Sequence, residues 1–77
     1  MTKFFFHVRN DEVLFEDRRG GEFTDLPAAW NWAVADARTM IQDGQLEGPL
    51  DKQWMEICDG AGKIVASLPF LRVAHLH

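Results

Sequence analysis

Apolar and polar residues alternate over residues 3–9, which is the pattern of a β-strand with two different faces. The purely apolar face would hold Phe4, Phe6 and Val8. The mixed face would hold Phe5, His7 and Arg9. Asn10 and Asp11 follow as a turn signal, because their side chains hydrogen-bond to nearby backbone. Residues 13–17 then predict a second, shorter strand, so the chain opens with a hairpin.

Residues 26–43 have the period of an amphipathic helix. Asp25 is the expected N-cap, and Pro27 is tolerated in the first turn, where its missing N–H has no partner. Gly44 is expected just after the helix, where a left-handed backbone costs glycine nothing. The predicted core stripe comprises Leu26, Trp30, Ala33, Val34, Ala37 and Ile41, with Ala29 and Met40 on its flank.

The second half of the chain predicts another hairpin, with strands at residues 53–58 and 63–68 joined by a glycine-rich turn at residues 59–62. In the first of these strands, Trp54, Glu56 and Cys58 alternate with Met55 and Ile57. In the second, one side is expected to hold Ile64, Ala66 and Leu68. Residues 71–77 carry neither a cap nor a turn signal, and we expect a loosely docked or frayed tail there.

The order strand, strand, helix, strand, strand predicts an α+β fold: a four-stranded, antiparallel-rich sheet with one helix packed across it. We expect one domain over residues 1–70 and a C-terminal tail over residues 71–77. The pattern leaves open whether the two hairpins meet through the first and fourth predicted strands or through the first and third.

Several short motifs occur together in a characteristic order. They are the strand Phe4-Phe5-Phe6-His7-Val8-Arg9, Asp17 with Gly20, residues 22–26, residues 59–63, and Leu68-Pro69-Phe70. In this order the chain resembles a family of short alphaproteobacterial proteins of unknown function. Its members open with an aromatic-Phe-Phe-His strand and close with a hydrophobic-Pro-Phe strand end. The resemblance implies a compact bacterial domain of the same build, and it assigns no activity, cofactor or catalytic residue.

Composition and charge narrow the classes of function. The chain has 77 residues and a formal net charge of -4, and its 8 basic residues are scattered. Nucleic-acid binding, which needs clustered Lys and Arg, is therefore not expected. No apolar run approaches the ~18–20 residues that cross a bilayer or the ~7–15 of a secretory signal, so we expect no membrane association and a cytoplasmic location. The single cysteine fits a reducing compartment.

No catalytic residue, cofactor or metal ligand set is expected. His7 has no partner histidine nearby in sequence, since His75 and His77 lie in the tail, and we interpret it as a structural residue. Cys58 is followed by Asp59, whose charge raises rather than lowers a thiol pKa, so an inert thiol is expected. A set of acidic residues near the first hairpin is interpreted as solvated turn carboxylates: Asp11, Glu12, Glu16, Asp17 and Glu22.

Trp32 does not fit the predicted helix, because it lies about 200° from Trp30 by helical rotation, opposite the core stripe. We expect it to be covered by the C-terminal tail at residues 71–76 or the loop at residues 46–50, or to form an intermolecular contact. Simple exposure to solvent is the remaining alternative. Both sheet faces also carry apolar residues, which one helix cannot cover.

These features favour a non-enzymatic module that self-associates or binds a protein partner. The candidate interaction surface comprises Trp32, Phe5, His7 and Trp54. The alternative is a regulatory domain that binds a small ligand on the open face of the sheet. The mass of the native protein at varied concentration distinguishes these two hypotheses.

Overall fold

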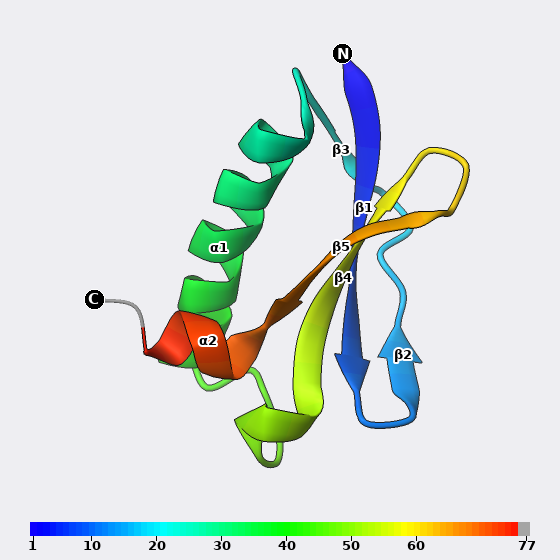
Figure 1. Cartoon of the computed structure of the whole chain (residues 1–77). Helices are drawn as coiled ribbons and strands as arrows, with labels where there is room; N and C mark the ends of the chain where they lie inside the picture. The colour runs from blue at the N-terminus through cyan, green and yellow to red at the C-terminus, as the bar shows by residue number, and fades with distance from the viewer. Residues whose placement is uncertain (76–77) are drawn as a thin grey trace.

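Five strands and two helices build the part of the chain that the computed structural model describes, residues 1–75 (Figure 1). They are β1 (Thr2–Asn10), β2 (Val13–Phe15), β3 (Gly21–Phe23), α1 (Leu26–Gln42), β4 (Gln53–Asp59), β5 (Ile64–Pro69) and α2 (Phe70–Ala74), with a 3-10 turn at Leu50–Lys52 before β4. The α+β class with an antiparallel sheet is confirmed. The expected four strands and single helix are wrong, because β3 and α2 were not predicted.

β1 and β4 form the centre of the sheet, whose order is β2-β1-β4-β5. All pairs are antiparallel, and β3 pairs with the start of β1 while β2 pairs with its end. β2 and β3 therefore share one edge of β1. The two hairpins meet through the first and third predicted strands, which decides between the two alternatives left open by the sequence.

Gly20 allows the chain to return to β1 as β3. The backbone of Gly20 has φ +64°, and a Cβ there would lie 2.6 Å from the carbonyl oxygen of Phe4. A side chain at this position would push the chain away from β1, so only glycine fits. Residues 21–23 then pair with residues 2–4 of β1. The sequence predicted only a lead into the helix here, since a three-residue strand is too short to show an alternating pattern.

The core lies between the sheet and both helices, which lie on the same side of it (Figure 1). Phe4 and Phe6 of β1 point into this core, as predicted. Met55 and Ile57 of β4 also point into it, which identifies the inward face of that strand. The centre of α1 is a line of three completely buried alanines, Ala29, Ala33 and Ala37. Trp30, the widest residue of the predicted stripe, is only partly buried. The helix is therefore rotated from its predicted orientation, because small side chains let its backbone approach the sheet closely.

The expected orientation of Ile64 is wrong, because β5 has a register shift. β5 pairs with β4 in steps from Trp54↔Pro69 to Ile57↔Ala66, and the next pair is Cys58↔Ile64, which leaves Val65 as an extra residue. An extra residue places the side chains on its two sides, here Ile64 and Ala66, on opposite faces of the sheet. Ile64 is consequently 51% exposed, whereas Leu68 is buried as expected.

The expected frayed tail is wrong for the described part of that segment. Residues 70–74 form α2, and its Phe70 and Val73 are buried in the core beside α1. Residues 76–77, including the His77 considered above, lie outside the described residues.

The ends of α1 follow the sequence signals. The side chain of Asp25 accepts a hydrogen bond from the backbone N–H of Ala28 at 2.9 Å, which confirms it as the N-cap. Gly44 follows the helix with φ +67°, as expected.

Candidate functional site

The sheet face opposite the helices carries no covering element among residues 1–75 (Figure 1). We call it the open face. Its two central strands contribute three cross-strand pairs: Phe5↔Cys58, His7↔Glu56 and Arg9↔Trp54. Phe5, His7 and Trp54 of the predicted interaction surface are thus brought together on neighbouring strands. Trp32 is not among them, because α1 lies on the other side of the sheet.

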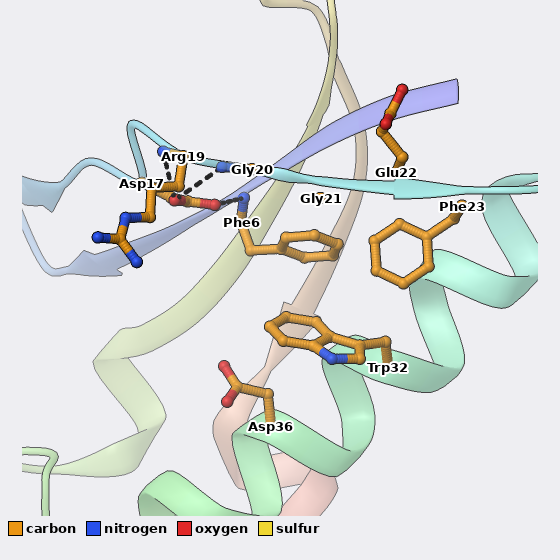
Figure 2. Close-up of a pocket in the computed structure, with 9 residues that line it drawn as sticks. All are labelled: Phe6, Asp17, Arg19, Gly20, Gly21, Glu22, Phe23, Trp32 and Asp36. Atoms are coloured by element: carbon orange, nitrogen blue, oxygen red, sulfur yellow. Dashed lines mark hydrogen bonds between the residues drawn. The ribbon is translucent and has the colours of Figure 1, made fainter. Parts of the chain in front are cut away.

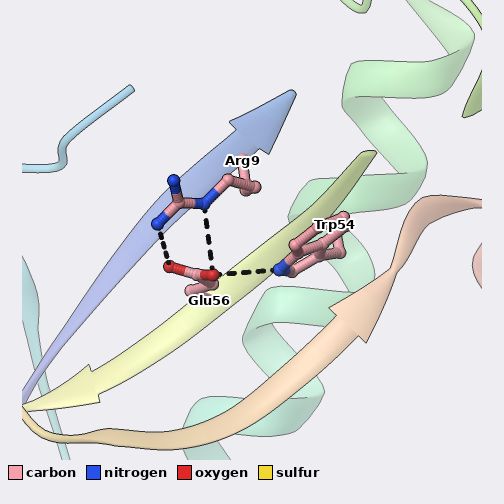
Figure 3. Close-up of polar contacts among 3 residues, drawn as sticks. All are labelled: Arg9, Trp54 and Glu56. Atoms are coloured by element: carbon pink, nitrogen blue, oxygen red, sulfur yellow. Dashed lines mark hydrogen bonds and ion pairs between the residues drawn. The ribbon is translucent and has the colours of Figure 1, made fainter. Parts of the chain in front are cut away.

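Glu56 ties two other side chains of the open face together (Figure 3). Its carboxylate accepts from the Trp54 Nε1–H at 3.0 Å and from Nε and Nη2 of Arg9 at 3.4 Å each. Burial alone would raise the pKa of Glu56, but the bonds from Trp54 and Arg9 and the Arg9 charge hold it below its ordinary value. Only 7% of Glu56 is exposed. These contacts favour the ionised carboxylate, which links Arg9 of β1 to Trp54 of β4.

His7 is fixed by the segment that links β2 and β3. Its Nδ1 accepts a hydrogen bond from the backbone N–H of Asp17 at 2.9 Å. Nδ1 therefore acts as the acceptor of the ring, which leaves Nε2 as its potential donor. The imidazole also stacks beside Phe5, with ring centroids 6.4 Å apart and planes 11° apart. These contacts agree with a structural histidine.

Asp17 is not the solvated turn carboxylate that the sequence suggested. Its Oδ2 accepts from the backbone N–H of Phe6 at 3.1 Å, and its Oδ1 accepts from Arg19 at 3.0 Å and Gly20 at 3.1 Å. Burial opposes ionisation, but these three bonds and the nearby His7 lower the pKa of Asp17. Asp17 occupies the stretch of the β1 edge that neither β2 nor β3 covers. The other four acidic residues of that set are exposed, as expected.

Cys58 lies in surroundings that disfavour its thiolate. It is 3% exposed on β4, and burial together with the charges of Glu56 and Asp59 raises the pKa of its thiol. This confirms the expected direction. A nucleophilic thiol needs the opposite surroundings, with a cation nearby and access to solvent.

Trp32 packs on aromatic rings of its own chain (Figure 2). Its indole lies 4.7 Å from the Phe6 ring and 6.0 Å from the Phe23 ring, centroid to centroid. These rings come from β1 and β3, not from the C-terminal tail or the loop that were expected to cover it. The indole nonetheless remains 46% exposed.

The exposed side of Trp32 borders a pocket of about 460 Å³. The pocket lies between α1, β3 and the link from β2, and we call it the Trp32 pocket. It is lined by Phe6, Asp17, Arg19, Gly20, Gly21, Glu22, Phe23, Trp32 and Asp36. The sequence analysis did not single out Asp36. The available signal was its spacing, since it lies one helical turn after Trp32 and so shares its face of α1.

Two further features bear on the class of site. Among residues 1–75, no three His, Cys, Asp or Glu side chains gather closely enough to hold a metal ion. None of the helices in that same part of the chain is long and apolar enough to cross a membrane.

Comparison with known proteins identifies a family. Searches of curated proteins and of solved structures find no match to this chain. The profile of the family described as "Domain of unknown function (DUF6894)" matches residues 3–71, nearly the whole described fold. The chain therefore belongs to the DUF6894 family of domains of unknown function.

Proposed function

We propose that this chain is a non-enzymatic module that self-associates, pairing the open face of its sheet with the same face of a second copy. The observation that carries the proposal is the tie between Arg9, Glu56 and Trp54 on an uncovered face. Trp and Arg are the residue types most often found at the energetic centre of protein interfaces. Because Glu56 already fixes both side chains, little side-chain freedom remains to be lost on binding.

The charge of the open face suits a second copy of the same chain. Lys3 lies over the Phe5 ring on this face, with its Nζ 5.9 Å from the ring centroid, and its cross-strand partner is Glu22. With Arg9 and Glu56, the face has two cations and two carboxylates. The chain as a whole has a net charge of -4, so its acidic excess lies elsewhere. Two such faces can therefore approach without net repulsion.

The area of the open face indicates how strongly two copies should associate. β1 has nine residues, or ~30 Å, and four strands lie side by side at ~4.8 Å spacing, which gives a face of at most roughly 600 Å². Two copies would bury about 1,200 Å², the lower limit for stable interfaces. We expect a symmetric dimer that dissociates on dilution.

Sedimentation velocity from about 1 µM to about 1 mM tests the proposal, a range chosen because small interfaces bind weakly. The wild-type protein is expected to pass from monomer to dimer within this range. The test variant is Ile64→Glu, because Ile64 is exposed on the open face and a carboxylate there would be desolvated without a partner. This variant should remain monomeric throughout.

Val13→Glu is the matched control. Val13 is also an exposed β-branched strand residue, but it pairs with Asn10 and so points to the helix side of the sheet. It should dimerise like the wild type. A wild-type protein that stays monomeric at the highest concentration contradicts self-association, and so does a dimer that only Val13→Glu disrupts.

A further inference from the structure

The Trp32 pocket is separate from the open face, because α1 lines it from the opposite side of the sheet. Its volume of about 460 Å³ lies within the ~300–1,000 Å³ usual for sites that bind small molecules. It also combines two kinds of wall, one aromatic and one acidic. Either wall alone would be unremarkable on a small domain, and their juxtaposition indicates a chemical class of ligand.

Three aromatic rings in mutual contact form the first wall. Phe6 meets Phe23 nearly edge to face, with centroids 5.6 Å apart and planes at 76°, and both rings touch Trp32. Phe6 is buried beneath the indole, which keeps Trp32 in place. The exposed part of the indole therefore faces the pocket from a fixed position. Among aromatic side chains, the tryptophan face attracts cations most strongly.

The second wall carries the carboxylates of Asp17 and Asp36. Figure 2 shows the Asp36 carboxylate directed toward the side of the pocket that holds Asp17, while the Glu22 side chain points away from the rings. Asp17 is held in place by its three backbone bonds. Partial burial and the charge of Asp17 raise the pKa of Asp36. From the described residues, 1–75, no hydrogen bond or ion pair reaches the Asp36 carboxylate.

We propose that the Trp32 pocket binds the head group of a small organic ammonium ion, with the Trp32 indole and the carboxylates of Asp17 and Asp36 as its recognition groups. A positive charge there lies against the indole face and between two carboxylates that otherwise repel each other. The aromatic wall favours an alkylated ammonium over a hydrated metal ion, because methyl groups pack on rings whereas a bound water shell does not. A small ligand would therefore bind in the Trp32 pocket and not on the open face of the sheet.

Choline is the probe, and its neutral counterpart of the same shape, 3,3-dimethylbutan-1-ol, is the control ligand. Both are titrated at constant ionic strength while the indole N–H resonances are followed by nuclear magnetic resonance. We expect choline to shift the Trp32 signal saturably, with those of Trp30 and Trp54 as internal references, and to bind at least about tenfold more tightly than the alcohol. Nα-acetyl-lysine methylamide, titrated in parallel, distinguishes a peptide-borne ammonium from a free one by which of the two binds more tightly.

Two variants test the assigned groups. Asp36→Asn keeps the shape of the side chain and should weaken choline binding about fivefold, since one partly screened charge is lost. Trp32→Leu removes the reporting indole, so its binding is followed through the backbone amide signals of Gly20 and Gly21, which line the pocket. Binding to this variant should be about tenfold weaker. Arg18→Ala is the matched control: Arg18 is an exposed cation of the same link but does not line the pocket, and its loss should not weaken binding.

Three results would overturn the proposal. One is the absence of a saturable shift of Trp32 with any ammonium probe. Another is equal binding of choline and the neutral alcohol, which would show that shape alone is recognised. The third is an Asp36→Asn variant that keeps its native spectrum and binds choline as the wild type does. Each result is independent of the oligomeric state, so failure of this proposal is distinguishable from failure of self-association.

Discussion

Asp17 and Asp36 border one pocket, yet their surroundings shift their pKa values in opposite directions. The pKa of Asp17 is lowered by the three backbone N–H groups that its carboxylate accepts, against the effect of burial. The pKa of Asp36 is raised by burial and by the neighbouring Asp17. At neutral pH the Asp17 charge therefore stabilises the fold and the Asp36 charge destabilises it. The same substitution at the two positions should reveal the difference.

We predict that Asp17→Asn lowers the urea midpoint at pH 7 and that Asp36→Asn raises it. An amide nitrogen cannot accept the bonds that one carboxylate oxygen accepts, so the first variant should lose about 1–3 kcal/mol. The stabilisation from Asp17 exists above its ordinary pKa of 3.8 and disappears as the pH falls through the lowered folded value. The destabilisation from Asp36 is absent below its ordinary pKa of 3.8 and is fully present once the pH has risen through the raised folded value.

Urea unfolding of the wild type and the two variants, from pH 7 down to about pH 3, measures both effects. On acidification, the urea midpoints of both variants should approach that of the wild type, Asp17→Asn from below and Asp36→Asn from above. Midpoints that move in the same direction at pH 7 would show that the two carboxylates do not differ in this way.

At the scale of the secondary-structure elements, the contact of α1 with the sheet is set by its smallest residues. Ala29, Ala33 and Ala37 recur at every fourth position and are completely buried. A helix that approaches a sheet through alanine leaves no room for larger groups, because protein interiors are close-packed. The larger residues Trp30 and Trp32 then lie to either side of this line, where they pack on the margins of the sheet.

We predict that Ala33→Leu destabilises the protein by at least about 1–3 kcal/mol, because three extra carbons must be accommodated at the closest approach of α1 to the sheet. Ala35→Leu is the matched control, since Ala35 is exposed on the same helix. That variant should change stability by less than about 0.5 kcal/mol. Chemical denaturation measures the free energy of unfolding of both variants. Equal values would show that Ala33 does not lie at the closest approach of α1 to the sheet.

The helices and strands differ in how well the sequence predicted them. Long periodic segments and capped ends were predicted closely, as for α1 with Asp25 and Gly44. β3 was missed because it has three residues and owes its pairing to Gly20, a tertiary contact. α2 was missed because a five-residue helix after Pro69 has no side-chain cap. The phase of α1 was misjudged because hydrophobicity favours Trp30, whereas the close approach of helix to sheet favours alanine.

The candidate site was predictable only in part, for a similar reason. Phe5, His7 and Trp54 share the open face because strand alternation is strictly periodic. The Trp32 pocket depends on where β3 returns to the sheet, which the pattern did not predict. The spacing of Asp17 to Gly20 was part of the sequence motif. Its bond to Phe6 could not be predicted, because the sequence does not show that the middle of the β1 edge lacks a partner strand.

At the scale of the whole molecule, β1 and β4 connect the two halves of the chain. β1 pairs with β2, β3 and β4, so every hydrogen-bonded part of the sheet depends on it directly or through β4. The pairing of β1 with β4 extends over seven residue pairs, from Phe4↔Asp59 to Asn10↔Gln53. By contrast, β2 contributes three pairs at the end of β1. Loss of β2 pairing can therefore occur without opening the core.

We predict that the amides of β1 and β4 that bond each other exchange with deuterium only through global unfolding. Those of β2 should exchange by local opening and be at least about tenfold faster, because few buried contacts hold that strand. Residue-resolved exchange at a protein concentration below any self-association measures both groups. If β2 proved as slow as the β1–β4 pair, the sheet would open as one unit instead.

The buried alanine line of α1 also has an evolutionary consequence. Its three positions and Gly20 are limited by space, so descent can vary them only among the smallest residues while the fold stays the same. The exposed residue Ile64 and the pocket carboxylate Asp36 are under no such limit of space, so their retention across lineages would point to selection for binding. Relatives that keep small residues at 29, 33 and 37 but diverge at 32 and 36 would have inherited the scaffold without the pocket.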